Sequence, residues 1–221
     1  MDFRDVEALT EANDAWPLLA ELADASPVGA RVVERDEVRS HECLVRLQVT
    51  TRSALGGLAY NCGGIVVDHG WLRILGGGHE GLHSLSEANR LPGPAAASTR
   101  PGFLVVAEDV LGGRFAVDGG ELGVEPGTVC YFGPDSLSWV DLGVGHGQFV
   151  EQMLSGAATE FYDDLRWSGW EREVAGVDLD KGLSLWPPPF SDEGQDVGAV
   201  SRAVVPHAEL VHFYEDMARQ L

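Results

Sequence analysis

Basic residues are scarce in this sequence of 221 residues. It has 15 Lys and Arg against 35 Asp and Glu, which gives a formal net charge of −20, and Lys181 is its only lysine. Phosphate backbones and anionic lipid headgroups repel such a charge, which argues against a nucleic-acid partner and against a membrane surface. Such a charge often serves solubility alone, and this is the simpler interpretation. The same charge also attracts basic proteins over a long range, which fits a basic protein partner.

Cysteine is also sparse, and no two cysteines have the spacing of a metal or redox site. Cys43, Cys62 and Cys130 are far apart and set among apolar residues, which is typical of buried thiols in a reducing compartment. The sequence lacks the basic start and apolar run of a signal peptide, and no stretch approaches about 18 uncharged apolar residues. We therefore expect a cytoplasmic protein.

Motifs for nucleotide binding and nucleophilic catalysis are missing. The glycine strings 76–78, 112–113 and 119–120 have no G-x-G-x-x-G or G-K-[ST] context, and no serine lies in a G-x-S-x-G elbow. Neighbouring acidic residues such as Glu108 and Asp109 point apart on a strand or helix, so they do not form an acid–base pair by themselves. The sequence predicts no catalytic residue and no cofactor.

One string does match a catalytic pattern. His79-Glu80-Gly81-Leu82-His83 has the H-E-x-x-H form of zinc metalloproteases, whose chemistry requires both imidazoles on one face of a helix. Three glycines precede the string and another lies within it, and each costs a helix about 1 kcal/mol relative to alanine. We interpret the string as a loop without a metal ligand, and a zinc hydrolase stays a remote alternative.

The remaining composition is that of a folded protein. Hydrophobic residues make up 44% and charged residues 23%, and the length suits one elaborated domain over residues 1–221. A Pro/Ala-rich loop near 92–101 does not divide this domain, because apolar strands resume directly after it. Between Glu160 and Asp196 ten acidic residues accompany three basic ones, so we expect this stretch to pack loosely. The C-terminal part near 171–205 is expected to be acidic and loop-rich.

The hydrophobic periodicity predicts an α+β fold, with an antiparallel meander sheet flanked by N-terminal and C-terminal helices. Two helical pieces before Pro27 and an amphipathic helix over 206–221 form the flanks. Ser53 is placed to cap a helix that ends near Asn61, and a helix around Phe149 ends at Gly156. A further helix is predicted over 161–165. The predicted strands are 43–49, 65–67, 71–75, 103–107, 114–117, 129–132 and 138–142.

Aromatic side chains gather near residue 167. Trp167 and Trp170 follow Phe161 and Tyr162, with Arg166 among them. Tryptophan and arginine are enriched in binding hot spots, so Arg166, Trp167 and Trp170 are candidates for a partner-binding surface. The alternatives are plain core packing and a carbohydrate cleft.

A set of strings extends along most of the chain. It comprises 47–53 (LQVTTRS), 63–68 (GGIVVD), 70–76 (GWLRILG), 107–109 (AED), 112–116 (GGRFA), 134–137 (PDSL) and the Phe-Tyr and Leu-Arg-Trp steps within 161–170. From about Trp16 to Pro206 the sequence resembles a bacterial family known as a domain of unknown function, DUF2625. The resemblance implies no particular activity. In that family the Gly78-His79 step lacks the following Glu and second His, which weakens the zinc alternative.

The order of the predicted elements has a second, more remote resemblance to a known superfamily. A Gly-Gly helix end, a hairpin around Gly112-Gly113 and a helix containing Phe149 are similar to the SUKH superfamily. Those proteins are α+β binding modules, and many are immunity proteins that neutralise toxins. The likeness favours binding over catalysis, although a fold alone does not fix a function.

Two functional hypotheses follow. The leading one is a non-catalytic, immunity-like interaction module, whose acidic surface and segment 166–170 engage a protein partner. The alternative is a small-molecule-binding protein or enzyme with a polar pocket around Arg52, Asp68 and Arg73. The full set of candidate pocket residues is Thr51, Arg52, Asp68, Trp71, Arg73 and His79.

Overall fold

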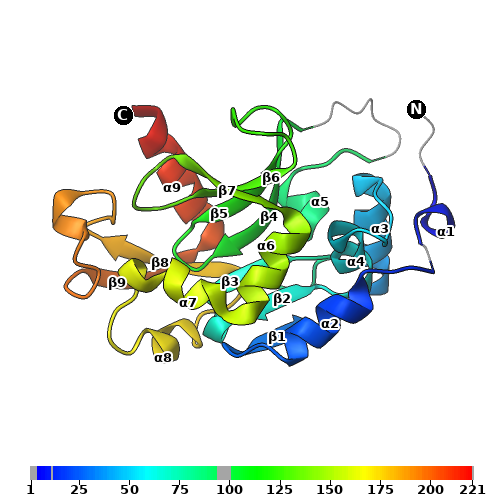
Figure 1. The fold of residues 1–221 in the computed structure, drawn as a ribbon. Helices are drawn as coiled ribbons and strands as arrows, with labels where there is room; N and C mark the ends of the chain where they lie inside the picture. The colour runs from blue at the N-terminus through cyan, green and yellow to red at the C-terminus, as the bar shows by residue number, and fades with distance from the viewer. Residues whose placement is uncertain (1–3, 11, 94–100, 221) are drawn as a thin grey trace.

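A single antiparallel sheet organises the molecule (Figure 1). The computed structural model describes residues 4–10, 12–93 and 101–220, so most of the predicted 92–101 loop lies outside the described residues. Within the described residues, the sheet has seven strands whose order across the sheet is their order along the chain, which confirms the predicted α+β meander. The strands are β1 (Ala30–Val33), β2 (Gly64–Val67), β3 (Leu72–Leu75), β4 (Phe103–Asp109), β5 (Arg114–Asp118), β6 (Thr128–Phe132) and β7 (Trp139–Gly145).

Helices form both flanks of the sheet, as predicted (Figure 1). They are α1 (Val6–Leu9), α2 (Trp16–Asp24), α3 (Glu37–Leu47), α4 (Ala54–Asn61), α5 (Leu85–Ala88), α6 (His146–Gln152), α7 (Ala158–Phe161), α8 (Trp170–Val174) and α9 (His207–Gln220). The side chain of Ser53 caps α4 by accepting from the Gly56 N–H. A π-helical turn, Met153–Ala157, follows α6 and breaks at Gly156, where φ is 105°. Both boundaries agree with the capping signals in the sequence.

The two faces of the sheet are covered by different parts of the chain. Successive side chains of a strand point to opposite faces. Phe115 on β5 points to the face covered by α6, because its ring lies 4.8 Å from the ring of Phe149. Arg114 points to the opposite face, where its Nη1 lies 2.7 Å from Glu215 Oε1 of α9. We call the first the helical face and the second the α9 face.

The acidic C-terminal part packs against the core, so the prediction that residues 160–196 pack loosely is wrong. β8 (Lys181–Trp186) and β9 (Ser201–Pro206) form a two-stranded antiparallel sheet. The Leu183 N–H donates to the Val110 carbonyl at 2.7 Å, and Leu183 and Leu185 are buried in the main core. Alternation of apolar residues in β8 was hidden by the acidic residues and prolines around it. This hairpin and α9 together form a C-terminal layer on the α9 face.

The predicted strand 43–49 is also wrong, because this segment belongs to α3. Asp36 caps the helix by accepting from the Arg39 N–H. The buried side chains of α3 are Ser40, Cys43 and Leu44, which repeat at helical spacing. Gln48 ends the helix in a left-handed conformation, with φ at 55°.

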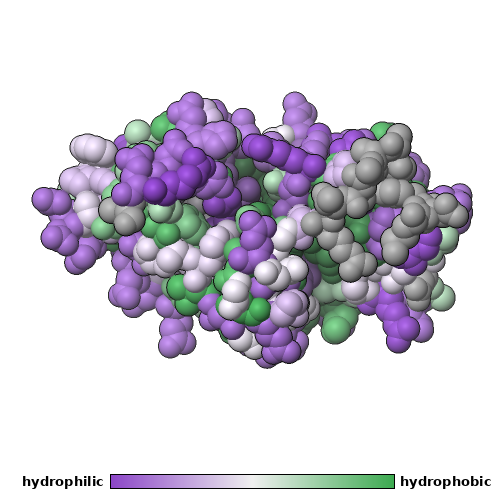
Figure 2. Space-filling model, turned by 90° about the horizontal axis from the view of Figure 1, so that it is seen from above, coloured by the Kyte–Doolittle hydropathy of each residue, from purple (hydrophilic) through white to green (hydrophobic). Residues whose placement is uncertain are grey.

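One face of the molecule is mostly polar. Figure 2 shows a face dominated by hydrophilic residues, with apolar atoms only in small scattered patches. No helix within the described ranges is long and apolar enough to span a bilayer. Among the residues that the structure describes, the exposed large apolar ones are Leu18, Val32, Val38, Val140, Trp186 and Val204.

Candidate functional site

The turn between β2 and β3 brings together residues from both predicted sets. Asp68 and His69 adopt left-handed backbone conformations, with φ of 53° and 58°, and Gly70 follows at 101°. Such conformations of non-glycine residues cost on the order of 1 kcal/mol each and need support from their surroundings. Here the Asp68 carboxylate forms a buried ion pair with Arg166. The ion pair therefore holds the strained turn against the segment between α7 and α8.

Aromatic rings surround this ion pair. The Trp71 ring lies 5.7 Å from the Trp167 ring and 5.1 Å from the Trp170 ring, between centroids. The Arg166 guanidinium lies 4.1 Å from the centroid of Trp170, and Trp167 Nε1–H donates to Glu173 Oε2 at 2.8 Å. Trp167 is only 6% exposed. Arg166 and Trp167 are thus placed in the core, and only the half-buried Trp170 offers part of its surface.

Arg73 lies in the interior as well. Its Nη1 donates to the carbonyls of Leu179 at 3.0 Å and Lys181 at 2.6 Å, which fastens β3 to the start of β8. Burial lowers the pKa of this guanidinium, and the nearby carboxylate of Glu108 opposes that shift. The position of Arg73 is explained by a structural role in holding the C-terminal layer.

The remaining pocket candidates do not join this cluster. Thr51 is buried, and its backbone N–H donates to the Leu9 carbonyl at 3.0 Å. Arg52 is exposed and His79 is half-buried. Among the described residues, no side-chain hydrogen bond or ion pair links Arg52 or His79 to Asp68 or Arg73. The structure thus gathers Asp68 and Trp71 with the predicted partner-binding residues and leaves Arg52 apart.

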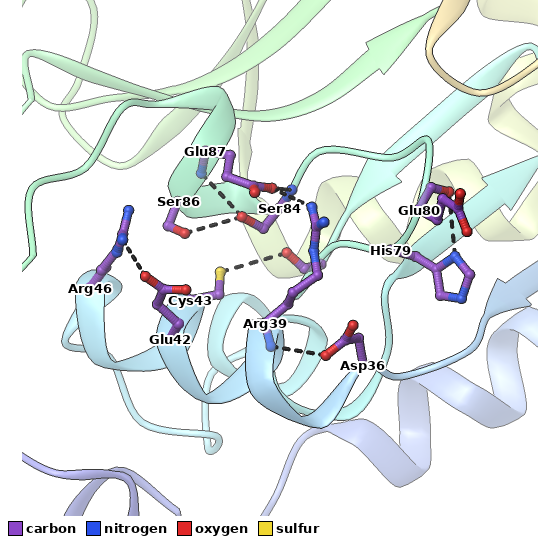
Figure 3. A network of polar contacts seen from close by, with 11 residues as sticks. Asp36, Arg39, Glu42, Cys43, Arg46, His79, Glu80, Ser84, Ser86 and Glu87 are labelled. Atoms are coloured by element: carbon purple, nitrogen blue, oxygen red, sulfur yellow. Dashed lines mark hydrogen bonds and ion pairs between the residues drawn. The ribbon is translucent and has the colours of Figure 1, made fainter.

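The His79–His83 string is a loop, as predicted (Figure 3). His79 and Leu82 exchange two backbone hydrogen bonds of 3.0 Å, and the His79 ring lies beside the carbonyl of Glu80. The two imidazoles therefore do not share a helical face. The helix begins only after the string, where Ser84 and Glu87 form a capping box and Glu87 pairs with Arg39 at 2.7 Å. Within the described ranges, no group of three His, Cys, Asp or Glu side chains is placed to hold a metal.

A row of charged side chains crosses the α9 face of the sheet. Arg73 on β3 is the cross-strand partner of Glu108 on β4, and Glu108 is the partner of Arg114 on β5. Arg114 is in turn opposite Phe132 on β6, and its guanidinium lies 5.3 Å from the centroid of that ring. Cross-strand partners point to the same face, so these side chains form one continuous line under the C-terminal layer.

A cleft opens at one end of this row, between β4, β5, the end of α5 and the middle of α9. Its volume is about 340 Å³. A bulge in β4 between Val105 and Ala107 shifts the alternation, which brings Phe103, Val105 and Glu108 to the same wall. Strict period-two alternation would have placed Val105 and Glu108 on opposite faces. We call this space the α9 cleft.

Opposite charges line the α9 cleft. Arg114 and Glu108 lie at its base, and Glu215 pairs with Arg114 across it. Arg90, Glu121 and His212 are exposed at its rim. Local sequence patterns do not predict this site, because Arg114 and Glu215, which meet there, are 101 positions apart. The sequence predicts a hairpin around Gly112-Gly113 and a strand that starts at Arg114, but it does not indicate that Arg114 meets Glu215.

His207 lies behind Glu108. Its Nδ1 is 3.4 Å from Glu108 Oε2, and its Nε2 is 3.0 Å from the Asp109 carbonyl oxygen. Asp109 itself points to the helical face, where its carboxylate accepts from the Tyr131 hydroxyl at 2.8 Å. Burial raises the pKa of Asp109, and this hydrogen bond opposes the shift. The two neighbouring carboxylates therefore serve different faces, as their adjacency predicts.

A second cleft of about 590 Å³ lies at the opposite end of the row. It separates the start of β1 and the strained turn from the loop 175–179. Its walls are mostly small and apolar, while Arg31, His69 and Asp178 stand exposed at its edge. Fewer polar side chains line this cleft than line the α9 cleft.

Relatives of known sequence place the chain in a family. A profile described as "Protein of unknown function DUF2625" matches residues 6–210. The chain is 35% identical over 191 residues to the "Putative uncharacterized protein YbfG" of Escherichia coli (strain K12), which covers 83% of this chain and 84% of that protein. It is 33% identical over 175 residues to an "Uncharacterized protein" of Haemophilus influenzae, which covers 78% and 77%. The chain therefore belongs to the family described as protein of unknown function DUF2625.

Proposed function

We propose that this protein is a non-catalytic interaction module of the cytoplasm that binds a basic protein partner through the β8–β9 hairpin. The observation that carries the proposal is Trp186, the last residue of β8, whose side chain is 66% exposed. Buried tryptophans are ordinary, whereas an exposed one on an ordered strand has the character of a binding hot spot. Val204 of β9 is also exposed, but it is opposite Leu183 and therefore points to the other face of the hairpin.

The charge of the segment that contains Trp186 favours a basic partner, although Arg202 on the neighbouring strand pairs with Glu173. Between Glu171 and Asp196 there are seven acidic residues against Arg172 and Lys181, and all seven acidic residues are exposed. An apolar anchor in an acidic surround favours a partner with a basic surface and repels acidic competitors. The expected anchor of the interaction is therefore Trp186, because Trp167 is buried.

The cytoplasmic location is supported by the thiols. Cys43, Cys62 and Cys130 are buried and free, and burial raises the pKa of Cys62 to about 12. Such thiols stay protonated and resist oxidation, which suits a reducing compartment. An immunity-like role, in which the module neutralises a basic protein, is the form of binding that the charge favours.

Affinity capture with matched variants tests the proposal. The full chain, Trp186→Ala and Val38→Ala are immobilised and exposed to lysate of the native host at about 50 mM and about 500 mM salt. Val38 is 76% exposed on α3 and serves as the control for loss of an exposed apolar side chain. We expect wild type and Val38→Ala to capture the same basic protein at low salt. Trp186→Ala should capture at least about tenfold less, and high salt should weaken all three.

The purified captured protein then gives the decisive measurement. Its dissociation constant should rise by about tenfold or more for Trp186→Ala and stay unchanged for Val38→Ala, by calorimetry. Equal affinity of wild type and Trp186→Ala would refute the proposed anchor. Capture of acidic or neutral proteins only would refute the proposed partner class.

A further inference from the structure

We propose that the α9 cleft binds a small zwitterion, a free α-amino acid with an uncharged side chain. This site is separate from the β8–β9 hairpin, and neither proposal depends on the other. The cleft volume of about 340 Å³ lies at the lower end of the range of small-molecule pockets. It suits a ligand of a few heavy atoms better than a nucleotide or an oligosaccharide.

The base of the cleft presents both signs of charge on a rigid support. Arg114 is 8% exposed and Glu108 is directly opposite it on the neighbouring strand. Arg114 is fixed from below by Phe132 and Trp139, whose ring centroids lie 5.3 and 5.7 Å from its guanidinium. Glu108 is fixed from behind by His207. Charged groups whose positions are set by packing lose little entropy when a ligand binds.

The rim of the cleft, like its base, carries both a positive and a negative side chain. Arg90 follows α5 and Glu121 follows the Asp118 turn, so one exposed cation and one exposed anion face the same opening. A carboxylate is recognised by arginine through paired hydrogen bonds, and an ammonium group is recognised by carboxylates. A ligand that carries both groups can satisfy both signs at once, which a simple anion or a simple amine cannot.

The net charge of the protein also affects anionic, cationic and zwitterionic ligands differently. The chain has a formal charge of −20, so a purely anionic ligand is repelled over a long range. A purely cationic ligand meets the carboxylates of Glu108, Glu121 and Glu215, but it also meets Arg90 and Arg114, of which Arg114 already pairs with Glu215. A zwitterion avoids both penalties. Phe103, Val105 and Val211 supply an apolar wall for its side chain.

Calorimetric titration of the full chain with each standard L-amino acid tests this site. We expect saturable binding of at least one amino acid with an uncharged side chain, at a dissociation constant below about 1 mM. Two analogues of the best ligand report on each charge. The N-acetyl derivative lacks the ammonium group and the carboxamide lacks the carboxylate, so each should bind at least about tenfold more weakly.

Rim variants locate the site without disturbing the buried base. Arg90→Asn keeps a residue that tolerates the left-handed backbone at this position, where φ is 50°, and Glu121→Gln is nearly isosteric. Each should weaken binding by about fivefold or more, while Arg31→Gln at the other cleft leaves it unchanged. The absence of saturable binding up to about 10 mM of every amino acid would overturn the proposal. So would an analogue that binds as tightly as the amino acid itself, or binding that neither rim variant alters.

Discussion

At the scale of single residues, the Asp68–Arg166 pair carries the most information. It comes from the two candidate sets that the sequence could not connect, and 98 positions separate its members. Both side chains are less than a tenth exposed. A buried pair of this kind is costly to break, because the remaining charge is left without a partner in a poorly solvating environment.

Asp68→Asn isolates this electrostatic effect. Asparagine tolerates the left-handed backbone of Asp68, so the change removes the charge and keeps the turn. We expect a loss of about 3–5 kcal/mol in the free energy of unfolding, measured with urea. The control is Asp178→Asn, which removes a carboxylate from an exposed pair with Lys181 and should have no measurable effect. Equal stability of wild type and Asp68→Asn would show that the pair adds nothing to the fold.

His146 gives the protein a predictable response to acid. Burial lowers the pKa of His146 to about 4, whereas an unfolded histidine titrates near pH 6.5. Between these values the unfolded chain binds more protons than the folded one, so stability is lost as the pH falls from about 6.5 toward 4. We expect His146→Gln to reduce this loss by about 1–3 kcal/mol, measured by urea unfolding at pH 7.5 and pH 5.

His83→Gln provides the comparison for that measurement. His83 is exposed in the loop before α5, so its replacement should leave the acid-dependent loss of stability unchanged. If His83→Gln and His146→Gln respond alike to pH, burial of His146 is not the cause.

At the scale of elements, the β4–β5 turn contacts residues on both faces of the sheet. The Asp109 carboxylate accepts from the backbone N–H of Leu111 and of Gly113 and from the Tyr131 hydroxyl. Gly112 follows with a φ of 92°, and a Cβ there would lie 2.8 Å from Leu210 of α9. The turn therefore needs glycine both for its own conformation and for the close approach of α9.

Gly113→Ala should disrupt this turn. A Cβ at Gly113 would lie 2.5 Å from the Tyr131 hydroxyl and closer still to the Asp109 carboxylate. We expect a loss of about 2 kcal/mol or more in unfolding free energy, since buried polar groups would have to move apart. In Gly176→Ala the added Cβ meets its nearest atom at 3.5 Å, so a change within about 0.5 kcal/mol is expected. A Gly113→Ala protein as stable as Gly176→Ala would contradict this account of the turn.

Elements were predictable from the sequence where periodicity and caps agree. Strands β2 to β7 and the boundary of α4 at Ser53 follow from apolar runs, turn glycines and capping side chains. The helix α3 was predicted as a strand because its sequence fits both periods. Cys43, Leu44 and Leu47 fit a helical stripe, whereas Val45, Leu47 and Val49 fit strand alternation. A short window cannot separate the two periods. The cap at Asp36 was the signal that could have decided it.

The site was less predictable than the fold, for a geometric reason. Arg114 and Glu215 are 101 positions apart, and Phe103 and Val105 reach the same wall as Glu108 only because of a bulge. Local patterns carry no record of either arrangement. The arginine-tryptophan segment was found by composition, but its burial depends on Trp71 and Asp68, which belong to a distant turn.

At the scale of the whole molecule, net charge sets the response to salt. Like charges on a compact surface repel one another, and a formal charge of −20 therefore works against the folded state. The screening length falls from about 30 Å at 0.01 M to about 3 Å at 1 M salt. We expect the melting temperature to rise with sodium chloride over this range, measured by calorimetry. A steady fall would show that attractive pairs outweigh the repulsion.

The order of strands in the sheet has a consequence for biosynthesis. Each strand from β1 to β7 pairs with its neighbour along the chain, so the sheet can grow strand by strand as the ribosome releases it. The β8–β9 hairpin and α9 emerge after the sheet is complete. Until then the row formed by Arg73, Glu108 and Arg114 stays hydrated. The segment 181–220, which is translated after the sheet, thus dehydrates the charged row and closes the α9 cleft in the same step.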